Sequence, residues 1–350
     1  MISQLDLAYL NRLRETSSAT LLGALRGKRD VAIIDAPNQR NVGDSLIWDG
    51  ELAYLKELGL HIHYVADLWT YDPVALRRSM PEGVVLLHGG GNFGDLWLGH
   101  QILREIVATD LVSYPIVQLP QSIHFRDPDR ATVANKILGS HPDFILLLRD
   151  QTSMDIAALL LPDVAAEFCY DMALGSAVTP STNTAHREGN VLVIARKDVE
   201  AASGLSELDG ASLPGASVTL TDWYPRGARA VEWHTSRAVS KSYRIYARVR
   251  RRLNIGPVGF PDRIGSTALS AINSANIRGA KELYSRADLV IVDRLHAHIL
   301  AVLLGIPHIV LDNSYGKISG IFNEYSGAFS TANYVDNLPA AIELAEELRS

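Results

Sequence analysis

The sequence predicts an α/β protein made of two doubly wound domains that face each other across a cleft. Short apolar runs, such as residues 31–34, 84–87 and 191–194, alternate along the chain with stretches of helical periodicity. That alternation is typical of parallel sheets with helices on both faces. The length of 350 residues exceeds what one hydrophobic core usually serves, so we expect two domains.

The domain boundary is expected in the polar stretch 180–190, which is rich in Ser, Thr and Asn and contains no apolar run. This gives an N-terminal α/β domain over residues 1–180 and a C-terminal α/β domain over residues 181–350. In doubly wound sheets, ligands bind beyond the carboxyl ends of the strands. We therefore expect the functional site in the cleft between the two sets of strand ends.

The N-terminal half opens with a predicted helix or helix pair over residues 5–25, where Leu recurs at helical spacing. The strand at 31–34 leads into a polar turn, 38–45, whose side chains can cap the helix that follows. Further strands are predicted at residues 61–65, 84–87, 116–119 and 144–148.

The C-terminal half repeats the alternation of strand and helix. Strands are predicted at residues 191–194, 289–292 and 308–311, with a weaker candidate at 218–220. Helices are predicted at residues 269–287, 299–304 and 338–348.

The bulk composition is that of a soluble cytoplasmic protein. Hydrophobic residues make up 47% and charged residues 21% of the chain, and the formal net charge is −6. That acidic balance argues against a nucleic-acid partner. Cys169 is the only cysteine, so no internal disulfide can form. The N-terminus lacks a basic region followed by an apolar one, and no apolar run is long enough to span a bilayer.

Residues 237–253 form a predicted basic amphipathic helix that departs from the acidic whole. Seven cationic residues lie between Arg237 and Arg252, with no acidic residue between Glu232 and Asp262. At about 100° per residue, most of these cations share one face: Arg237, Lys241, Arg244, Arg248, Arg251 and Arg252. Arg250 falls outside that face. Such a face is either solvated or lies on an anionic membrane. We predict membrane or lipid-phosphate contact through Lys241, Arg244, Arg248 and Arg251.

The most informative stretch is Asp293-Arg294-Leu295-His296-Ala297-His298, which lies between the apolar runs 289–292 and 299–304. It is a predicted turn at the carboxyl end of a strand and the start of a helix. A helix N-terminus carries unpaired N–H groups and partial positive charge, which favours an anion. An Arg and two His residues at that point predict a site for an acidic, phosphorylated small molecule.

His296 is the predicted catalytic residue, because an imidazole at a strand-end turn can exchange protons or bind phosphate. His298 follows two positions later and so faces well away from His296 on a helix, which makes surface or packing its expected role. There is no His-Glu-x-x-His sequence and no Cys cluster, so we expect no protein-ligated metal and no cofactor.

The glycine-rich stretch 88–95 allows several interpretations. Gly89, Gly91 and Gly94 fit the dinucleotide fingerprint after a strand. His-Gly-Gly-Gly is similar to an esterase oxyanion loop, but the chain has no Gly-x-Ser-x-Gly. A third interpretation has the glycines bring backbone N–H groups close to a ligand, with Asn92 and Asp95 contacting sugar hydroxyls. A tight structural turn is the remaining possibility.

Several cationic and polar residues follow other predicted strands. Arg149, Arg196 and Lys197 each come directly after an apolar run, where a guanidinium suits a carboxylate or phosphate, though a salt bridge is an alternative role. Lys317 follows Gly316 and is either an anion clamp or a loop lysine. Asp171 is predicted to be a turn residue. No Gly-Lys-Ser/Thr phosphate loop exists, which excludes that class of nucleotide hydrolase.

At these residues the chain resembles the polysaccharide pyruvyltransferase family. The matching segments span about residues 38–317 and are Asn41-Val42-Gly43-Asp44, residues 88–95, Leu148-Arg149-Asp150, residues 293–298 and Leu304-Gly305-Ile306-Pro307. The resemblance implies a GT-B-like arrangement of two Rossmann-like domains. It also implies transfer of a pyruvyl group from phosphoenolpyruvate (PEP) to sugar hydroxyls, giving a cyclic ketal.

The resemblance suggests that His296 and a strand-end arginine, assigned to Arg196, contact PEP. The strand-end residues and the resemblance together give the expected PEP side, which is formed by His296, Arg294, Arg196, Lys317, Arg149 and Asn313. The expected acceptor side is formed by Asn41, Asp44, Gly90, Gly91, Asn92 and Asp95. The expected partners are PEP and a lipid-pyrophosphate-linked glycan at the inner membrane surface. Two alternatives are a GT-B nucleotide-sugar glycosyltransferase and a non-catalytic sugar-phosphate-binding protein.

Overall fold

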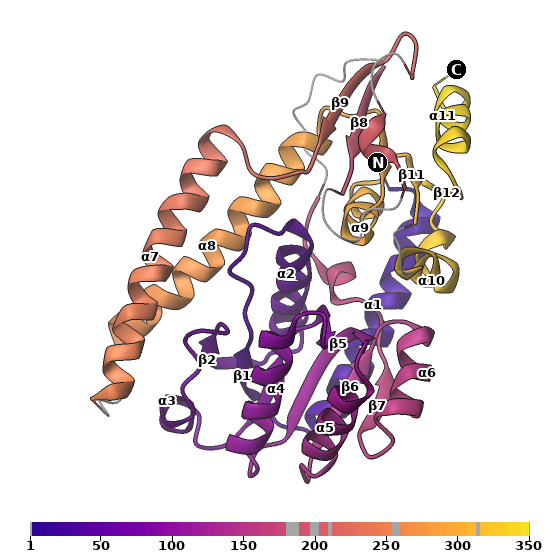
Figure 1. Cartoon of the computed structure of the whole chain (residues 1–350). Helices are drawn as coiled ribbons and strands as arrows, with labels where there is room; N and C mark the ends of the chain where they lie inside the picture. Colours follow the sequence, from indigo (N-terminus) through magenta and orange to yellow (C-terminus); the bar gives the residue numbers. More distant parts are fainter. Residues whose placement is uncertain are drawn as a thin grey trace.

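The computed structural model describes residues 2–179, 189–196, 203–208, 212–253, 259–312 and 316–349, with residues 259–262 and 317 described by their backbone alone. These residues form two parallel sheets with helices packed against them (Figure 1). The predicted α/β class with two Rossmann-like sheets is confirmed.

The first sheet has the strand order β2-β1-β3-β5-β6-β7, and β4 pairs with the far end of β5. Every pairing in it is parallel. Strands β3 and β6 are apolar along their whole length because helices cover both faces, whereas the central strand β5 also carries the buried polar residues Gln118, Gln121 and Ser122. The strands are β1 (Asp30–Ile34), β2 (His61–Ala66), β3 (Val84–Leu87), β4 (Gly90–Gly94), β5 (Ile116–His124), β6 (Phe144–Leu148) and β7 (Ala165–Phe168).

Most helices of this half begin at a side-chain cap that the sequence supplies. Asn41, Asp72, Asp127 and Asp150 each accept a backbone N–H of the helix that follows. The helices are α1 (Gln4–Leu25), α2 (Val42–Glu57), α3 (Pro73–Ser79), α4 (Leu98–Asp110), α5 (Pro128–Gly139), α6 (Gln151–Leu160) and the 3₁₀ turn η1 (Met172–Gly175).

The second sheet has the order β12-β11-β10-β8-β9 and is also parallel. Its strands are β8 (Asn190–Ile194), β9 (Ser217–Thr221), β10 (Leu289–Val292), β11 (His308–Val310) and β12 (Ala332–Tyr334). Its helices are η2 (Leu205–Glu207), α7 (Gly227–Arg252), α8 (Gly259–Tyr284), α9 (Leu295–Leu304), α10 (Lys317–Glu324), η3 (Ser326–Ala328) and α11 (Leu338–Glu347).

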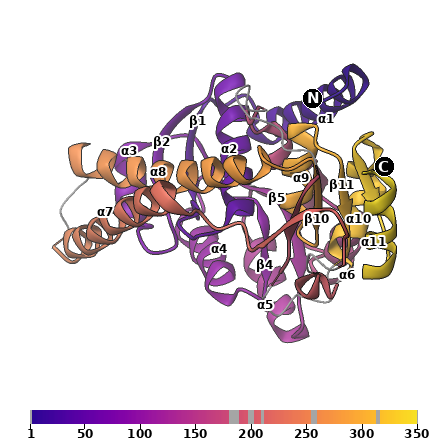
Figure 2. The same cartoon turned by 90° about the horizontal axis from the view of Figure 1, so that it is seen from above.

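A helical hairpin, α7 and α8, links β9 to β10 but packs on the first half of the molecule. Viewed from above, α8 lies over α2 (Figure 2). Asn273 and Asn276 of α8 donate to backbone carbonyls before α2 and contact the buried Ser45 hydroxyl. At the far end of α7, Arg244 and Arg250 form ion pairs with Asp67 and Asp72.

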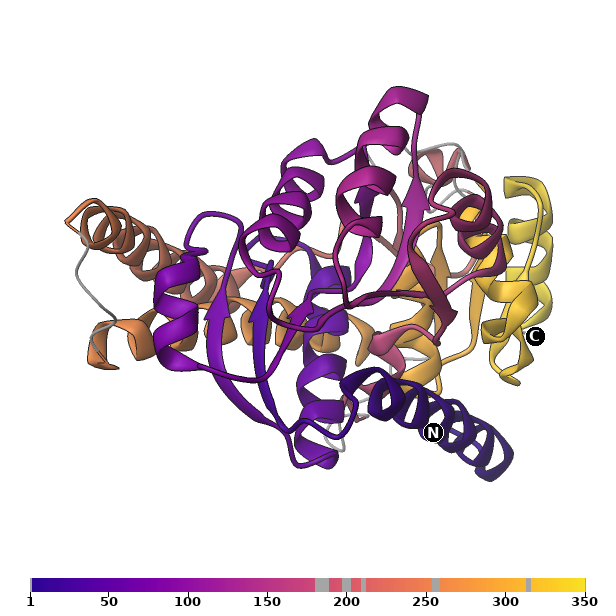
Figure 3. The same ribbon diagram turned by 90° about the horizontal axis from the view of Figure 1, so that it is seen from below.

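The opening helix α1 ties the halves together from the other side, and it is one continuous helix (Figure 3). Its Asp6 carboxylate accepts the backbone N–H and the hydroxyl of Ser330, and Tyr9 donates to the Tyr325 carbonyl. Apolar residues of both halves therefore form one continuous core cluster.

Two elements, residues 90–94 and helix α7, differ from expectation for physical reasons. Residues 90–94, expected as a loop or turn, form a short strand because they pair with β5. Helix α7 begins at Gly227, ten residues before the basic run. Arg244 and Arg250 lie on the inner face of α7, where Asp67 and Asp72 neutralise them. The sequence pattern could not show which face α8 and the first half would cover.

Candidate functional site

A cleft of about 310 Å³ lies between the carboxyl ends of the two sheets. Its lining from the first half is Gln39, Arg40, Asn41, Gly43, Asp44, Gly91, Asn92, Trp97, His100 and Arg149. Its lining from the second half is Arg196, Trp223, Tyr224, Arg294, Leu295, His296 and Ile318. The volume is in the usual range for a small-molecule site.

The N-terminus of α9 opens directly onto this cleft. The buried strand β10 ends at Val292, and Arg294 stands at the N-cap without a side-chain cap for the helix. The preceding Asp293 carboxylate fixes the turn, because it accepts the Arg196 backbone N–H at 2.8 Å and the Ser203 hydroxyl at 2.6 Å. The first N–H groups of α9 therefore have no side-chain acceptor and favour an anion.

His296 lies in the first turn of α9, and its side chain is 14% exposed. Its Nε2 lies 3.3 Å from Asp171 Oδ2 and 3.4 Å from Arg149 Nη1. Arg149, at the end of β6, donates from Nη1 to the same Asp171 oxygen at 2.6 Å and from Nε to Ser122 at 3.0 Å. The imidazole is thus oriented by a buried carboxylate that an arginine holds in place.

Asp171 remains ionised although it is buried. Burial alone would raise the pKa of its carboxyl, but the Arg149 guanidinium and the His296 imidazole hold that pKa well below its usual range. Its other oxygen caps η1 by accepting the Ala173 N–H at 2.8 Å. From the sequence alone Asp171 was predicted only as a turn residue, because its partners lie far away in the chain.

The start of α2 forms the wall facing His296. Asn41 caps the helix by accepting the Gly43 N–H, and its amide donates to the Asp44 carboxylate at 2.9 Å. Gly43 packs against His296 so closely that a Cβ there would lie 2.9 Å from Nδ1. Only glycine leaves the imidazole in its present position.

The glycine-rich stretch supplies part of the cleft floor. Gly91 and Asn92 line the cleft, whereas Gly90 is buried below it with a φ of 130°. The stretch continues as strand β4 and does not enter a helix directly, which is not the geometry of a dinucleotide fingerprint. Asp95 is outside the lining and accepts the backbone N–H groups of Arg126 and Asp127.

A buried polar layer beneath that floor holds it in position. Glu51 of α2 accepts the Gly89 N–H and contacts His88 Nδ1, each at 2.8 Å. Burial opposes charge on His88, but Glu51 outweighs it and raises the pKa of the imidazole. Arg104 donates to the Asn92 side-chain and backbone oxygens, and burial lowers its pKa to about 10.

The remaining predicted cations divide into two groups. Arg196 and Arg294 line the cleft at the ends of β8 and β10, and Arg294 also forms an ion pair with Asp222. Lys197 and Asn313 lie outside the described residues, as does the side chain of Lys317. Of the predicted PEP side, the structure brings together His296, Arg149, Arg196 and Arg294.

Sequence reasoning missed several residues of the cleft. Arg40, Trp97, His100, Trp223 and Tyr224 line it, and Asp35 lies behind His100. The position of Asp35 directly after an apolar strand could have marked it as a candidate site residue. His100 carried none, because it lies inside a helix that the pattern did not single out.

The predicted His298 packs into the interior. Its ring is buried against His308, Ser326 and Phe322. Within the described ranges, no group of three or more His, Cys, Asp or Glu side chains is arranged to hold a metal ion. Among the helices that the structure describes, none has the length and apolar character of a membrane span.

Comparisons with known proteins show which chains this one is similar to. Residues 41–315 match the polysaccharide pyruvyl transferase family. The chain is 30% identical over 319 residues to Pyruvyl transferase 1 of Schizosaccharomyces pombe, covering 85% of this chain and 70% of that protein. It is 29% identical over 329 residues to "Putative pyruvyl transferase EpsO" of Bacillus subtilis, covering 91% and 94%. A Klebsiella pneumoniae crystal structure of an uncharacterised protein shares the fold alone, with a TM-score of 0.54, 15% identity and coverage of 92% and 98%.

Proposed function

The chain belongs to the polysaccharide pyruvyl transferase family, and from that premise we propose that it transfers the pyruvyl group of PEP to two hydroxyls of one sugar. The product is a cyclic pyruvate ketal on a glycan. The observation that carries the proposal is the clustering of His296, Arg149, Arg196 and Arg294 at one cleft with the uncapped start of α9.

PEP is a compact trianion with a phosphate and a carboxylate. Arg196, Arg294 and the N–H groups that begin α9 supply separate anion-binding elements on the second half. Arg149 is already bound to Asp171, so its role is to hold the carboxylate that orients His296 as well as to add positive charge.

Ketal formation needs a proton at C3 of PEP, an oxygen at C2 and departure of phosphate. His296 in its acid form donates the proton to C3 as the π bond breaks and a sugar hydroxyl adds at C2. The C2–O bond to phosphate then breaks, and phosphate leaves with the electron pair and takes up the proton of the first hydroxyl. A second hydroxyl of the same sugar closes the ring and returns a proton to His296. The Asp171 carboxylate, 3.3 Å from Nε2, holds the His296 imidazole in position for the transfer.

The acceptor sugar binds on the first half. Asn41, Asp44, Gly91 and Asn92 face the cleft there and offer the amide, carboxylate and backbone groups that recognise hydroxyls. Gly90 and Asp95 support this wall from behind by their backbone and loop contacts.

The proposal is tested by comparing the melting temperature of the protein with PEP, UDP-sugars and NAD, and by assaying phosphate release from PEP. Ligand that binds only the folded state raises Tm, so PEP at about 100 times its Kd contributes roughly 2.7 kcal/mol. We expect stabilisation by PEP, no shift with NAD, and phosphate release that requires a glycan acceptor. Protection by a nucleoside diphosphate alone would instead identify a glycosyltransferase, and PEP binding without phosphate release would identify a binding protein.

The acceptor is proposed to be linked to a lipid pyrophosphate, with the outer face of α7 meeting the cytoplasmic face of the membrane. That face carries exposed apolar residues, including Ile245 at 63% and Val249 at 48% exposure. Exposed Lys241, Arg248, Arg251 and Arg252 lie beside or near them. An apolar strip bordered by cations suits an anionic lipid surface. Arg244 is left out of the proposed membrane-facing set, because its side chain forms an ion pair with Asp67 of the first half.

Replacing Lys241, Arg248 and Arg252 with Gln should weaken binding to vesicles that contain anionic lipid. Each cation near such a surface contributes about 1 kcal/mol, so we expect a loss of roughly 100-fold. Vesicle co-sedimentation measures it, and turnover of a soluble sugar acceptor should not change. The matched control replaces three exposed lysines of the first half, Lys28, Lys56 and Lys136. Equal losses in both triple variants would contradict a specific α7 contact.

A further inference from the structure

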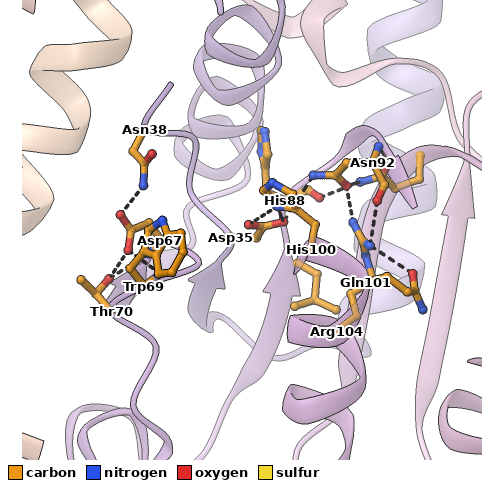
Figure 4. A network of polar contacts seen from close by, with 12 residues as sticks. Asp35, Asn38, Asp67, Trp69, Thr70, His88, Asn92, His100, Gln101 and Arg104 are labelled. Atoms are coloured by element: carbon orange, nitrogen blue, oxygen red, sulfur yellow. Dashed lines mark hydrogen bonds and ion pairs between the residues drawn. The ribbon is translucent and has the colours of Figure 1, made fainter. Parts of the chain in front are cut away.

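A second imidazole–carboxylate pair lies in the same cleft, on the half opposite His296. His100, in the first turn of α4, lines the cleft, and its Nδ1 lies 2.8 Å from both oxygens of Asp35 (Figure 4). Neither residue has a part in the PEP side described above.

The carboxylate of Asp35 is held rigidly in this place. Asp35 directly follows β1 and has a φ of 71°, a left-handed conformation that costs free energy for a residue other than glycine. The side chain is 4% exposed, and the Asn92 amide contacts its Oδ2 at 3.4 Å. Asn92 is itself fixed by Arg104 and Gln121. A strained backbone and a layer of buried polar contacts thus aim one carboxylate at one imidazole nitrogen.

This contact decides which nitrogen of His100 can act on a ligand. A carboxylate accepts but does not donate, so Nδ1 carries the proton and donates it to Asp35. In the neutral ring, Nε2 then carries the lone pair. The side chain is 17% exposed and borders the cleft, so the ring has access to a bound molecule.

We propose that His100 is a second catalytic residue, the general base that deprotonates the acceptor hydroxyl, and that Asp35 is its positioning residue. The inference rests on the proposed function and assigns a residue to the acceptor half of that reaction. His100 lines the same cleft as Asn92 and Gly91 of the acceptor wall, and its partner Asp35 contacts Asn92, while His296 lies on the PEP side. Each half of the cleft therefore supplies one acid–base group.

The proton balance uses both groups. His100 Nε2 takes the proton of the first hydroxyl as its oxygen bonds to C2, and His296 gives a proton to C3. His100 then gives its proton to the departing phosphate as the C2–O bond to phosphorus breaks. The second hydroxyl bonds to C2 and gives its proton to His296. Both imidazoles return to their starting states, and the products are the ketal carboxylate and hydrogen phosphate.

The test compares His100→Gln and Asp35→Asn with a matched control, His63→Gln. His63 also pairs with a carboxylate, Asp30 at 2.7 Å, but it lies at the amino end of the first sheet, away from the cleft. Loss of a general base lowers rates by about 10² to 10⁴. We expect kcat to fall about 100-fold in His100→Gln with the KM for PEP unchanged, and the control to match wild type. A kcat within threefold of wild type in His100→Gln would overturn the proposal.

Asp35→Asn needs a readout that a merely structural role would not move. We expect its kcat to fall, and the Asp35→Asn/His100→Gln double variant to be no slower than His100→Gln alone, because the two act as one unit. Nitrogen-15 NMR of histidine-labelled wild type should show His100 protonated at Nδ1, assigned by the signal lost in His100→Gln. Addition of the soluble glycan should shift its Nε2 signal.

The NMR measurement separates this proposal from the proposed function. A wild-type protein that releases no phosphate from PEP with any acceptor would refute the proposed transfer reaction, and the spectrum would still report on His100. A proton on Nε2, or an Nε2 signal that the glycan leaves unchanged, would overturn the role of His100 even where PEP is consumed normally.

Discussion

Replacing His296 with Asn should lower kcat by about 10³-fold while the protein remains folded, because the acid that delivers a proton to PEP is lost. The side chain is partly exposed and its contact with Asp171 Oδ2 is long, at 3.3 Å, so little stability depends on it. Phosphate release under saturating PEP and glycan measures kcat, and thermal unfolding measures Tm. Turnover within tenfold of wild type would remove His296 from the mechanism.

A companion variant, Gly43→Ala, tests the position of the imidazole without removing it. The added Cβ would lie 2.9 Å from His296 Nδ1 and 3.2 Å from its Cβ, so the ring must move. Alanine is a better helix former than glycine, and Gly43 lies inside α2, so the fold should tolerate the change. We expect a large fall in kcat with an unchanged or slightly higher Tm. Normal turnover would show that the present ring position is not the active one.

The free energy of unfolding should fall by about 4 kcal/mol, about 2 for each ring, between pH 7 and pH 5 through the buried His298–His308 pair. His308 Nδ1 lies 2.8 Å from the Ile306 carbonyl and must donate to it, so Nε2 accepts from His298 Nδ1 at 2.7 Å. The Ser326 hydroxyl lies 2.8 Å from His298 Nε2, which accepts its proton in the neutral ring, and 3.2 Å from the Ile321 carbonyl oxygen. A further proton on His308 Nε2 would place two N–H groups against each other, and burial opposes charge on either ring.

The sign of the effect follows from the direction of the shifts. Burial lowers the pKa of His308 to about 4, and burial together with His308 lowers the pKa of His298 well below its usual value. In the unfolded chain both titrate near 6.5. Their stabilisation is therefore complete above pH 6.5 and is lost as the pH falls toward 4. The His88–Glu51 pair has the opposite sign, because its raised pKa favours the folded state at lower pH.

Urea unfolding at several pH values measures this dependence. A double variant with His298→Leu and His308→Leu removes both partners of the inner bond, so no ring nitrogen is left unpaired. Its free energy of unfolding should lose the decline between pH 7 and pH 5. An equal decline in wild type and double variant would contradict the assignment. An NMR titration of the wild-type imidazoles reports the same pKa values directly and does not depend on the variant folding.

The sequence located one half of the site because its signals were local. A buried strand, a turn with His296 and Arg294, and a helix follow one another within a few residues, and the structure has that order. Asp171 orients His296 from 125 positions away in the chain, and no periodicity encodes such a pairing. His100 had no signal for the same reason, since its role depends on a carboxylate 65 positions earlier.

The basic helix α7 shows what helical periodicity alone cannot predict. Helical arithmetic grouped the cations of α7 but could not tell which of them face solvent. Arg250, which fell outside the predicted face, is buried near Asp72, and Arg244 turns inward to Asp67. Strand β4 was missed because glycine has little intrinsic preference for a strand. Its close approach to β5 excludes a Cβ at Gly94, which would lie 1.8 Å from the His124 carbonyl oxygen.

The packing of α7 and α8 on the first half restricts motion of the two halves of the enzyme relative to each other. A hinge rotation that pulled the sheets apart would have to break the Arg244–Asp67 ion pair and the amide contacts of Asn273 and Asn276 beneath it. On the other flank it would separate Asp6 from Ser330. Contacts on both flanks therefore oppose any motion that would widen the cleft between the two sheets.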